Sequence, residues 1–262
     1  MFEEVLEEIA QENALREVNT SLKLAAGLGG ILLALVSTGY VAPLFIAVAM
    51  SVAVLLLARI DPFTYASIYA APLSFALLSV AAIVLISGGS EELWSWQPLP
   101  WLSLSVAVES INQGFYVLCR TLGGTSALLF IALTTPMTDL FAVMRRCRVP
   151  ASVVELSMIV YRTIFVLLDQ LVQVYHAQVM RLGYSTRRES VTSFATLCGT
   201  GFIASWNAGE DLVRARELRC YEGALVVLGD VRPVEFRPAL VVVGFLVAAA
   251  SLAALTGTIT VV

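Results

Sequence analysis

Two short stretches of the sequence carry an arginine in the same setting. They read AQVMRLGY at 177–184 and ARELRCY at 215–221, and each places an arginine four residues after an alanine. These arginines, Arg181 and Arg219, lie 38 residues apart. A guanidinium group is a planar fork of hydrogen-bond donors that suits carboxylates and exposed carbonyl groups. The pair therefore predicts two similar contacts with protein partners rather than a chemical reaction.

No other set of residues in the sequence predicts catalysis. The chain has no GxxxxGK[ST] run that would bind ATP, no HExxH motif and no GxSxG motif. Its four cysteines are spaced neither as zinc ligands nor as a disulfide framework, and His176 is the single histidine. The net charge of −4 gives no basic excess that would suggest nucleic acid. We therefore expect a non-catalytic protein.

The composition places the chain among membrane proteins. Of its 262 residues, 58% are hydrophobic and only 14% are charged. The mean hydropathy is +0.85. Soluble domains are typically about half apolar and about a quarter charged. The acidic N-terminus lacks the basic segment of a secretory signal, so we expect no cleaved signal peptide.

The apolar stretches predict an all-α membrane protein with about five transmembrane helices. A membrane helix needs about 20 mostly apolar residues. The predicted spans are 22–38, 41–58, 64–87, one within 104–135, and 239–257. The fourth region contains Glu109, Asn112, Gln113 and Arg120. It can be one long or broken helix with these side chains turned into the bundle, or two shorter segments.

The distribution of charge predicts how the chain is oriented in the membrane. Of the 16 Lys and Arg residues, 11 lie between residues 137 and 235. The loop 88–103 has no Lys or Arg but has three tryptophans, which is typical of an outer interface. The positive-inside rule therefore places the N-terminus and the insert before the last span in the cytoplasm. We divide the chain into an acidic N-terminal helix with four spans (1–136), a cytoplasmic or interfacial domain of long amphipathic helices (137–237) and a last span (238–262).

The insert is predicted to contain a long amphipathic helix that begins at Pro150. Residues 151–182 contain neither Gly nor Pro. Their polar residues recur every seven positions and so share one face; they are Glu155, Arg162, Asp169 and His176. An ionised residue near the bilayer centre costs roughly 2.5–3.5 kcal/mol. We therefore expect this helix to lie at or below the membrane surface.

The two arginines are predicted to end two helices. Gly183 is a suitable C-cap, which places Arg181 in the last turn of the long helix. Asn207 can cap a second helix, with Glu210 three residues later and Arg219 near its end. Each arginine could simply cap its own helix. Two matched copies on one insert favour the docking of two similar soluble subunits.

The segment between these helices, residues 190–206, is uncharged and rich in small residues. It has about the minimum length of a membrane span. If it crossed the membrane, one arginine motif would lie outside among basic residues. The positive-inside rule therefore favours a segment that packs under the bundle.

The arginine motifs and several other stretches resemble the T component of energy-coupling factor transporters, most closely the CbiQ type of cobalt and nickel uptake. The resemblance covers most of the chain. It rests on NTSLKL at 19–24, TTPMTDLFAVMRRCRVP at 134–150, YR at 161–162 and the pair MRLGY and LRCYEG. In the family the paired motifs are typically Ala-Arg-Gly or close variants. Here the corresponding residues are Met180, Arg181, Leu182 and Gly183 in one motif, and Leu218, Arg219 and Cys220 in the other.

The resemblance implies a coupling subunit without chemistry of its own. Such proteins join two cytoplasmic ABC-type ATPases (CbiO type) to a membrane subunit that captures the metal (CbiM or NikM type), often with a small membrane protein (CbiN type). Each arginine would enter a groove on one ATPase. ATP and Mg²⁺ would bind to these ATPases, and this chain would bind neither metal nor cofactor. Candidate contacts with the capture subunit or within the bundle are Pro136, Asp139, Pro150, Glu155 and Arg162.

Two other functions remain open on the sequence. A T component for another micronutrient, such as a vitamin, would share this plan. A self-contained secondary transporter or channel would instead use Glu109, Asn112 and Arg120 as a site near the middle of the membrane. Such a transporter would move its substrate without ATPases.

Overall fold

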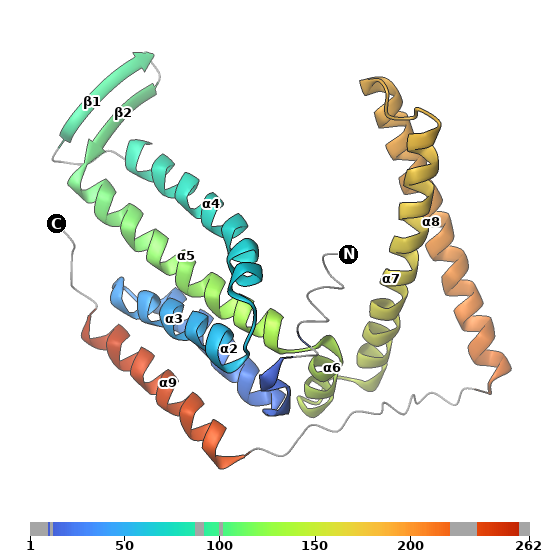
Figure 1. Ribbon diagram of the computed structural model, residues 1–262, viewed down its shortest axis with the longest axis horizontal. Coiled ribbons are helices and arrows are strands. Elements are labelled where there is room, and N and C mark those ends of the chain that lie inside the picture. Colours follow the sequence, from blue (N-terminus) through green and yellow to red (C-terminus); the bar gives the residue numbers. More distant parts are fainter. Residues whose placement is uncertain (1–9, 11–12, 87–91, 100–101, 221–234, 257–262) are drawn as a thin grey trace. The chain divides into compact units, whose positions relative to one another are not determined.

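The computed structural model describes residue 10 and residues 13–86, 92–99, 102–220 and 235–256 (Figure 1). These residues are almost entirely helical, which confirms the all-α class. In chain order the elements are η1 (Ala14–Glu17), α2 (Thr20–Val36), α3 (Val41–Val52), the π-helical turn η2 (Ala53–Leu57), α4 (Pro62–Ile86), β1 (Glu92–Leu99), β2 (Leu102–Ala107), α5 (Val108–Thr134), α6 (Met137–Arg146), α7 (Ala151–Met180), α8 (Arg187–Leu218) and α9 (Phe236–Leu255). The predicted acidic N-terminal helix falls on residues that, except for Ala10, lie outside the described part of the chain.

The chain forms two compact units. The first consists of Met1–Leu140 with Asp230–Val262, and the second of Phe141–Gly229. We call the first the bundle unit, since it contains α2 to α5 and α9. We call the second the arm unit, since it contains the long helices α7 and α8. Helix α6 begins in the bundle unit and ends in the arm unit.

Helix α5 is the central helix of the bundle unit. Helices α2, α3 and α4 all pack against it, and α9 packs against α2 and α3. Association of helices in lipid depends on close packing, which small residues allow. The buried positions of this unit accordingly include many small residues, among them Ala26, Ala34, Ala42, Ser126 and Ala127. Gly123 of α5 lies directly against the backbone of Pro43 in α3.

This close approach gives a stability prediction with an internal control. A Cβ atom at position 123 would lie 2.7 Å from the carbonyl oxygen of Pro43, whereas a Cβ atom at the neighbouring Gly124 would meet nothing within 4 Å. Overpacking of this kind typically costs about 1–3 kcal/mol. We expect Gly123→Ala to lower the melting temperature of the purified protein and Gly124→Ala to leave it unchanged or raise it. Equal melting temperatures for the two variants would contradict this packing.

Four of the described helices are long and apolar enough to cross a membrane: α4, α5, α7 and α9. The single helix α5 confirms one long helix in the region 104–135 rather than two shorter segments. Glu109 and Gln113 are exposed, however, and not turned into the bundle as predicted. Helix α2, and α3 with η2, occupy the predicted spans 22–38 and 41–58 as shorter apolar helices. The chain is therefore a membrane protein. Helix α7 meets the same criterion of length and composition although we predicted it at the membrane surface.

Two paired strands replace part of the loop predicted at 88–103 and the first residues of the region 104–135. Strands β1 and β2 pair antiparallel, with Trp94 opposite Val106 and Trp96 opposite Leu104. The sequence here, WSWQ in one strand and LSLSV in the other, alternates apolar and polar residues with a period of two. That period is the usual signal of a strand and was overlooked in a chain dominated by helices.

Helix α8 differs most from its prediction. We expected a helix to begin at Asn207, but one helix runs from Arg187 to Leu218. It begins with a capping box: Thr186 accepts a hydrogen bond from the backbone N–H of Glu189 at 3.3 Å. The hydroxyl of Ser185 also donates to the Glu189 carboxylate, which lowers the pKa of that carboxyl and keeps it anionic at the positive end of the helix.

The small polar residues after this cap continue the helix rather than breaking it. The hydroxyls of Thr192, Thr196 and Thr200 each donate to the carbonyl oxygen four residues earlier, at 2.7–3.1 Å. Gly201 faces α7, where a Cβ atom would lie 2.7 Å from the side chain of Leu171. The segment 190–206 is therefore the first half of α8. Among the described helices, α8 is not one of those apolar enough to cross a membrane.

Candidate functional site

The two motif arginines occupy the same position at the ends of two long helices. Arg181 follows the last residue of α7 with φ −90° and ψ 13°, and Arg219 follows the last residue of α8 with φ −92° and ψ 10°. Both side chains are exposed. The residue before each is large, apolar and almost fully exposed, at 84% for Met180 and 86% for Leu218. We call Met180–Leu182 the first tip and Leu218–Cys220 the second tip.

The residue after each arginine has a left-handed backbone. Leu182 has φ 60° and Cys220 has φ 51°. Their amides donate to the carbonyls three residues earlier, Val179 at 3.0 Å and Glu217 at 3.1 Å. The sequence prediction of Gly183 as the C-cap was therefore wrong: the arginine is the C-cap, and the left-handed residue is Leu182. For a residue other than glycine this conformation costs roughly 1–2 kcal/mol.

Helices α7 and α8 form a hairpin that separates the tips. At the turn, Ser193 donates from its hydroxyl to the carbonyl of Gly183 at 2.8 Å, and the Gln178 amide donates to the carbonyl of Ser193 at 3.2 Å. A Cβ atom on Gly183 would lie 2.6 Å from the Ser193 hydroxyl, so only glycine fits there. The first tip lies beside the start of α8 and the second tip at its end (Figure 1). At 1.5 Å per residue, the 32 residues of α8 place the tips about 48 Å apart.

The polar face predicted on α7 is exposed. Arg162, Asp169 and His176 are exposed, Glu155 is half-buried, and the exposed Pro150 is the N-cap of the helix. Within the described residues no group of three His, Cys, Asp or Glu side chains is placed to hold a metal ion. This face therefore offers charges for a contact with a protein or with the membrane surface.

Helix α8 carries an apolar surface that the sequence analysis missed. Phe202 and Trp206 are 69% and 63% exposed, and Val191 and Val213 are also exposed. At 100° per residue these four side chains point within about 40° of Phe202, whereas the partly buried face on the other side consists largely of small residues. We call Val191, Phe202, Trp206 and Val213 the α8 stripe. Its members are 11, 4 and 7 residues apart, which is close to whole turns of one helix, and this pattern becomes visible only when α8 is read as a single helix.

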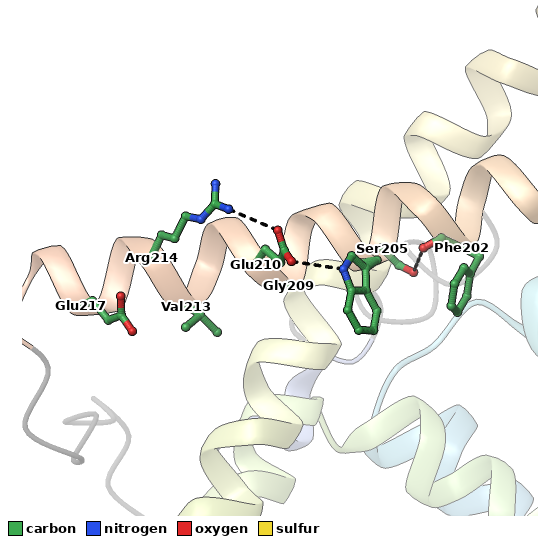
Figure 2. A pocket seen from close by; sticks show the side chains of 8 residues that line it. Phe202, Ser205, Gly209, Glu210, Val213, Arg214 and Glu217 are labelled. Atoms are coloured by element: carbon green, nitrogen blue, oxygen red, sulfur yellow. Dashed lines mark hydrogen bonds and ion pairs between the residues drawn. The ribbon is translucent and has the colours of Figure 1, made fainter.

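Charged side chains border the α8 stripe. Part of the stripe lines an open hollow along one helix face; the lining residues are Phe202, Ser205, Trp206, Gly209, Glu210, Val213, Arg214 and Glu217 (Figure 2). Figure 2 shows the Glu210 carboxylate held from both sides on the helix surface. The indole N–H of Trp206 donates to it at 3.3 Å and Arg214 donates to it at 3.4 Å. The hollow thus combines aromatic surface with fixed charges, as protein interfaces do.

In the bundle unit, a buried lysine lies where NTSLKL meets the end of α5. Asn19 caps α2 by accepting from the backbone N–H of Ser21 at 2.8 Å. Lys23, which is only 2% exposed, donates to the carbonyl oxygen of Thr134 at 2.9 Å. That carbonyl is one of the four at the helix end without a partner inside the helix, and a cation suits this negative end. The structure thus gives the lysine a specific partner that the sequence did not reveal.

Two of the predicted contact residues lie at the same junction. Asp139, in the first turn of α6, accepts a hydrogen bond from the Thr20 hydroxyl at 3.2 Å. Pro136 is buried just before α6. NTSLKL and TTPMTDL, far apart in the chain, are therefore in contact. A contact of these residues with a capture subunit remains a prediction.

The residues of the alternative site near the middle of the membrane are spread along α5. Glu109 is exposed in the first turn of α5 and lies 11 residues, or about 16 Å, from Arg120 along the helix. Arg120 donates instead to the carbonyl of Leu35 near the end of α2 and to the Tyr116 hydroxyl. Arg120 therefore joins α5 to α2 through its hydrogen bond to the Leu35 carbonyl.

The sequence matches the CbiQ family, described as cobalt transport protein, over residues 11–227. It is 37% identical over 86% of its length to a putative fused cobalt transport protein CbiMQ of Methanocorpusculum labreanum, and covers 38% of that longer protein. It is 29% identical to the cobalt transport protein CbiQ of Rhodobacter capsulatus, over 89% of this chain and 88% of the relative. A shorter match, 29% identical over 58% of this chain and 60% of the relative, is to the energy-coupling factor transporter transmembrane protein EcfT of Ruminiclostridium cellulolyticum.

Proposed function

Because the chain belongs to the CbiQ family of cobalt transport proteins, we propose that it is the T component of an energy-coupling factor transporter and transmits the motion of two ATPases to a metal-capture subunit. The observation that carries the proposal is the repetition of one tip geometry. Each tip has an exposed apolar residue, a C-cap arginine and a left-handed residue. Two equal tips about 48 Å apart suit two similar partner subunits.

Each tip would bind one ATPase of the CbiO type. The guanidinium group would donate to carboxylate or carbonyl groups of a groove, and the apolar residue before it would fill a neighbouring pocket. ATP and Mg²⁺ would be held entirely by the ATPases, and this chain would bind no metal or cofactor. The exposed arginines would bind the ATPases and transmit the direction of their movement.

The arm unit would carry the motion. When ATP brings the two ATPases together, each pulls on the end of a helix of 30 or 32 residues. The packing of Gly183 on Ser193 and of Gly201 on Leu171 joins these helices, so a displacement at the tips moves both. A stiff hairpin of this kind works as a lever because packed helices shift as rigid bodies.

The α8 stripe would bind the capture subunit. Exposed aromatic side chains that form one surface mark protein or membrane contacts. The name of the fused relative, CbiMQ, supports a CbiM-type capture subunit as partner. A small CbiN-type membrane protein would be an additional partner. Cobalt is the proposed substrate; nickel or another micronutrient would change the capture subunit rather than this chain. Pro136, Asp139, Pro150, Glu155 and Arg162 remain further candidates for this contact.

We place the arm unit on the cytoplasmic side of the cell membrane. The positive-inside rule supports this orientation, because Arg145, Arg146 and Arg148 precede α7 and further arginines follow it. Although α7 is apolar enough to span, it carries Glu155, Arg162 and Asp169. Each would cost roughly 2.5–3.5 kcal/mol at the membrane centre. A helix at the surface avoids this cost.

Purification of the tagged chain tests the proposal. The chain would be expressed together with candidate ATPases and capture subunits and purified in mild detergent. The mass of the purified complex would then be measured by native mass spectrometry. We expect a complex with two ATPase copies and one membrane partner. A chain that purifies alone and takes up Co²⁺ in liposomes without ATPases would contradict the proposal and favour a secondary transporter.

A further inference from the structure

The motif arginines alone do not account for the left-handed residues that follow them, Leu182 and Cys220. The role inferred for these two residues rests on the docking of the tips on ATPases proposed above. Non-glycine residues with positive φ are uncommon, and helix ends normally use glycine in this place. Four non-glycine residues with positive φ occur in the described part of the chain: Arg59, Arg148, Leu182 and Cys220. Two of these four directly follow a motif arginine.

The effect of this conformation is to separate the arginine from the chain that follows. A right-handed residue would add another helical turn, whose side chains would cover the arginine and the apolar residue before it. The left-handed residue instead turns the backbone away from the helix axis. The result is visible in the exposure of both tips, since Met180 and Leu218 are among the most exposed large apolar residues described.

The agreement between the tips extends to the whole local backbone. The arginines differ by only a few degrees in φ and ψ, and the residues after them by 9° in φ. Neither Leu182 nor Cys220 favours this conformation by itself. Arg59 and Arg148 adopt the same left-handed backbone after η2 and α6, so this conformation also ends other helices of the described chain. At the tips it coincides with an exposed arginine and an exposed apolar residue before it.

We propose that Leu182 and Cys220 are positioning residues, whose left-handed backbone directs Arg181 and Arg219 and the preceding apolar side chains into the ATPase grooves. The side chains themselves contribute less than the backbone. Glycine, which adopts this conformation freely, should therefore replace either residue without loss of docking. Valine, which is branched at Cβ and is an outlier in this region, should not.

The test measures docking of purified ATPase on the full-length chain in nanodiscs, with glycine and valine variants at both positions. We expect Leu182→Gly and Cys220→Gly to bind within about threefold of the unchanged chain. We expect Leu182→Val and Cys220→Val to bind roughly tenfold more weakly each, because valine disfavours the left-handed state. Normal ATPase binding by the glycine variants would show that the weaker binding of the valine variants does not come from the missing leucine or cysteine side chain.

Matched controls use the same exchanges in regular helix. Cys198→Val changes an exposed cysteine within α8, and Leu156→Val changes an exposed leucine within α7. Both should bind ATPase as the unchanged chain does. The glycine variants should keep or slightly raise the melting temperature and the valine variants should lower it slightly, because only the local backbone preference changes at these exposed positions.

The outcomes separate this inference from the proposed function. If the valine variants bind as tightly as the unchanged chain while Arg181→Glu and Arg219→Glu do not bind, the left-handed backbone has no positioning role and the inference is wrong. If the arginine variants also bind normally, the tips are not the docking elements and the proposed function fails with it. Weak binding of the glycine variants would likewise overturn the inference, because it would assign the effect to the side chains.

Discussion

A variant with both Arg181→Glu and Arg219→Glu is expected to reach the membrane in normal amount but to retain neither ATPase. Both side chains are exposed at helix ends, so the exchange should cost the fold little beyond the loss of about 0.3–1 kcal/mol per helix dipole interaction. In the complex, however, each glutamate would meet the groups that bound the guanidinium. Truncation of one partner of a buried charge pair typically costs about 2–5 kcal/mol. Docking at each tip should weaken by roughly 30-fold or more.

The measurement combines co-purification of ATPase with uptake of radioactive Co²⁺ in cells. Uptake should fall to the level of cells without the chain. Arg188→Glu is the matched control, because it reverses an exposed arginine of the same helix, α8, but near its beginning, where a carboxylate is favourable. This control should keep both ATPase binding and uptake. Normal uptake in the double variant would contradict the proposed role of the tips.

The second large effect is expected at the α8 stripe. Removal of the side chains in a Phe202→Ala, Trp206→Ala variant should release the capture subunit while both ATPases stay bound. Aromatic residues at the centre of an interface often contribute about 2 kcal/mol or more each, which is roughly 30-fold in affinity per residue. The variant should therefore hydrolyse ATP without transporting metal. Co-purification of each partner and the ratio of uptake to hydrolysis would measure this.

Ile203→Ala provides the comparison for the stripe. Ile203 lies next to Phe202 in sequence and is similarly exposed, but it points about 100° away around the helix. It should keep the capture subunit. Equal loss in this control, or full retention in the double variant, would show that the α8 stripe contacts something other than the capture subunit.

The sequence correctly predicted the helices that correspond to long uninterrupted runs of residues. Helix α7 follows from 32 residues without Gly or Pro, and α5 and α9 follow from long apolar runs. Helix α8 was divided wrongly because Asn207 and Glu210 form a plausible start. The true start, Thr186 and Glu189, has the same capping pattern. The local sequence cannot decide which of these two caps begins the helix. The packing of α8 along α7 decides it.

Only part of the candidate site could be predicted from the sequence. The repeat of arginine after an apolar residue identified both tips, because it needs no knowledge of the fold. The left-handed conformation was not predictable, since Leu182 and Cys220 have no preference for it and the glycine signal lies one residue later, at Gly183. The contact between Lys23 and Thr134 joins residues 111 positions apart, so no local pattern could reveal it.

The central claim is that each tip contacts an ATPase on the cytoplasmic side. The most direct measurement places a photo-crosslinking amino acid at Met180 or at Leu218, the exposed apolar residues of the two tips, in membranes that contain the ATPases. We predict a crosslinked product with an ATPase from either position, and with a second ATPase copy when both positions carry the probe. Crosslinks to lipid alone, or labelling of either tip by a reagent confined to the outer side of the membrane, would contradict the account.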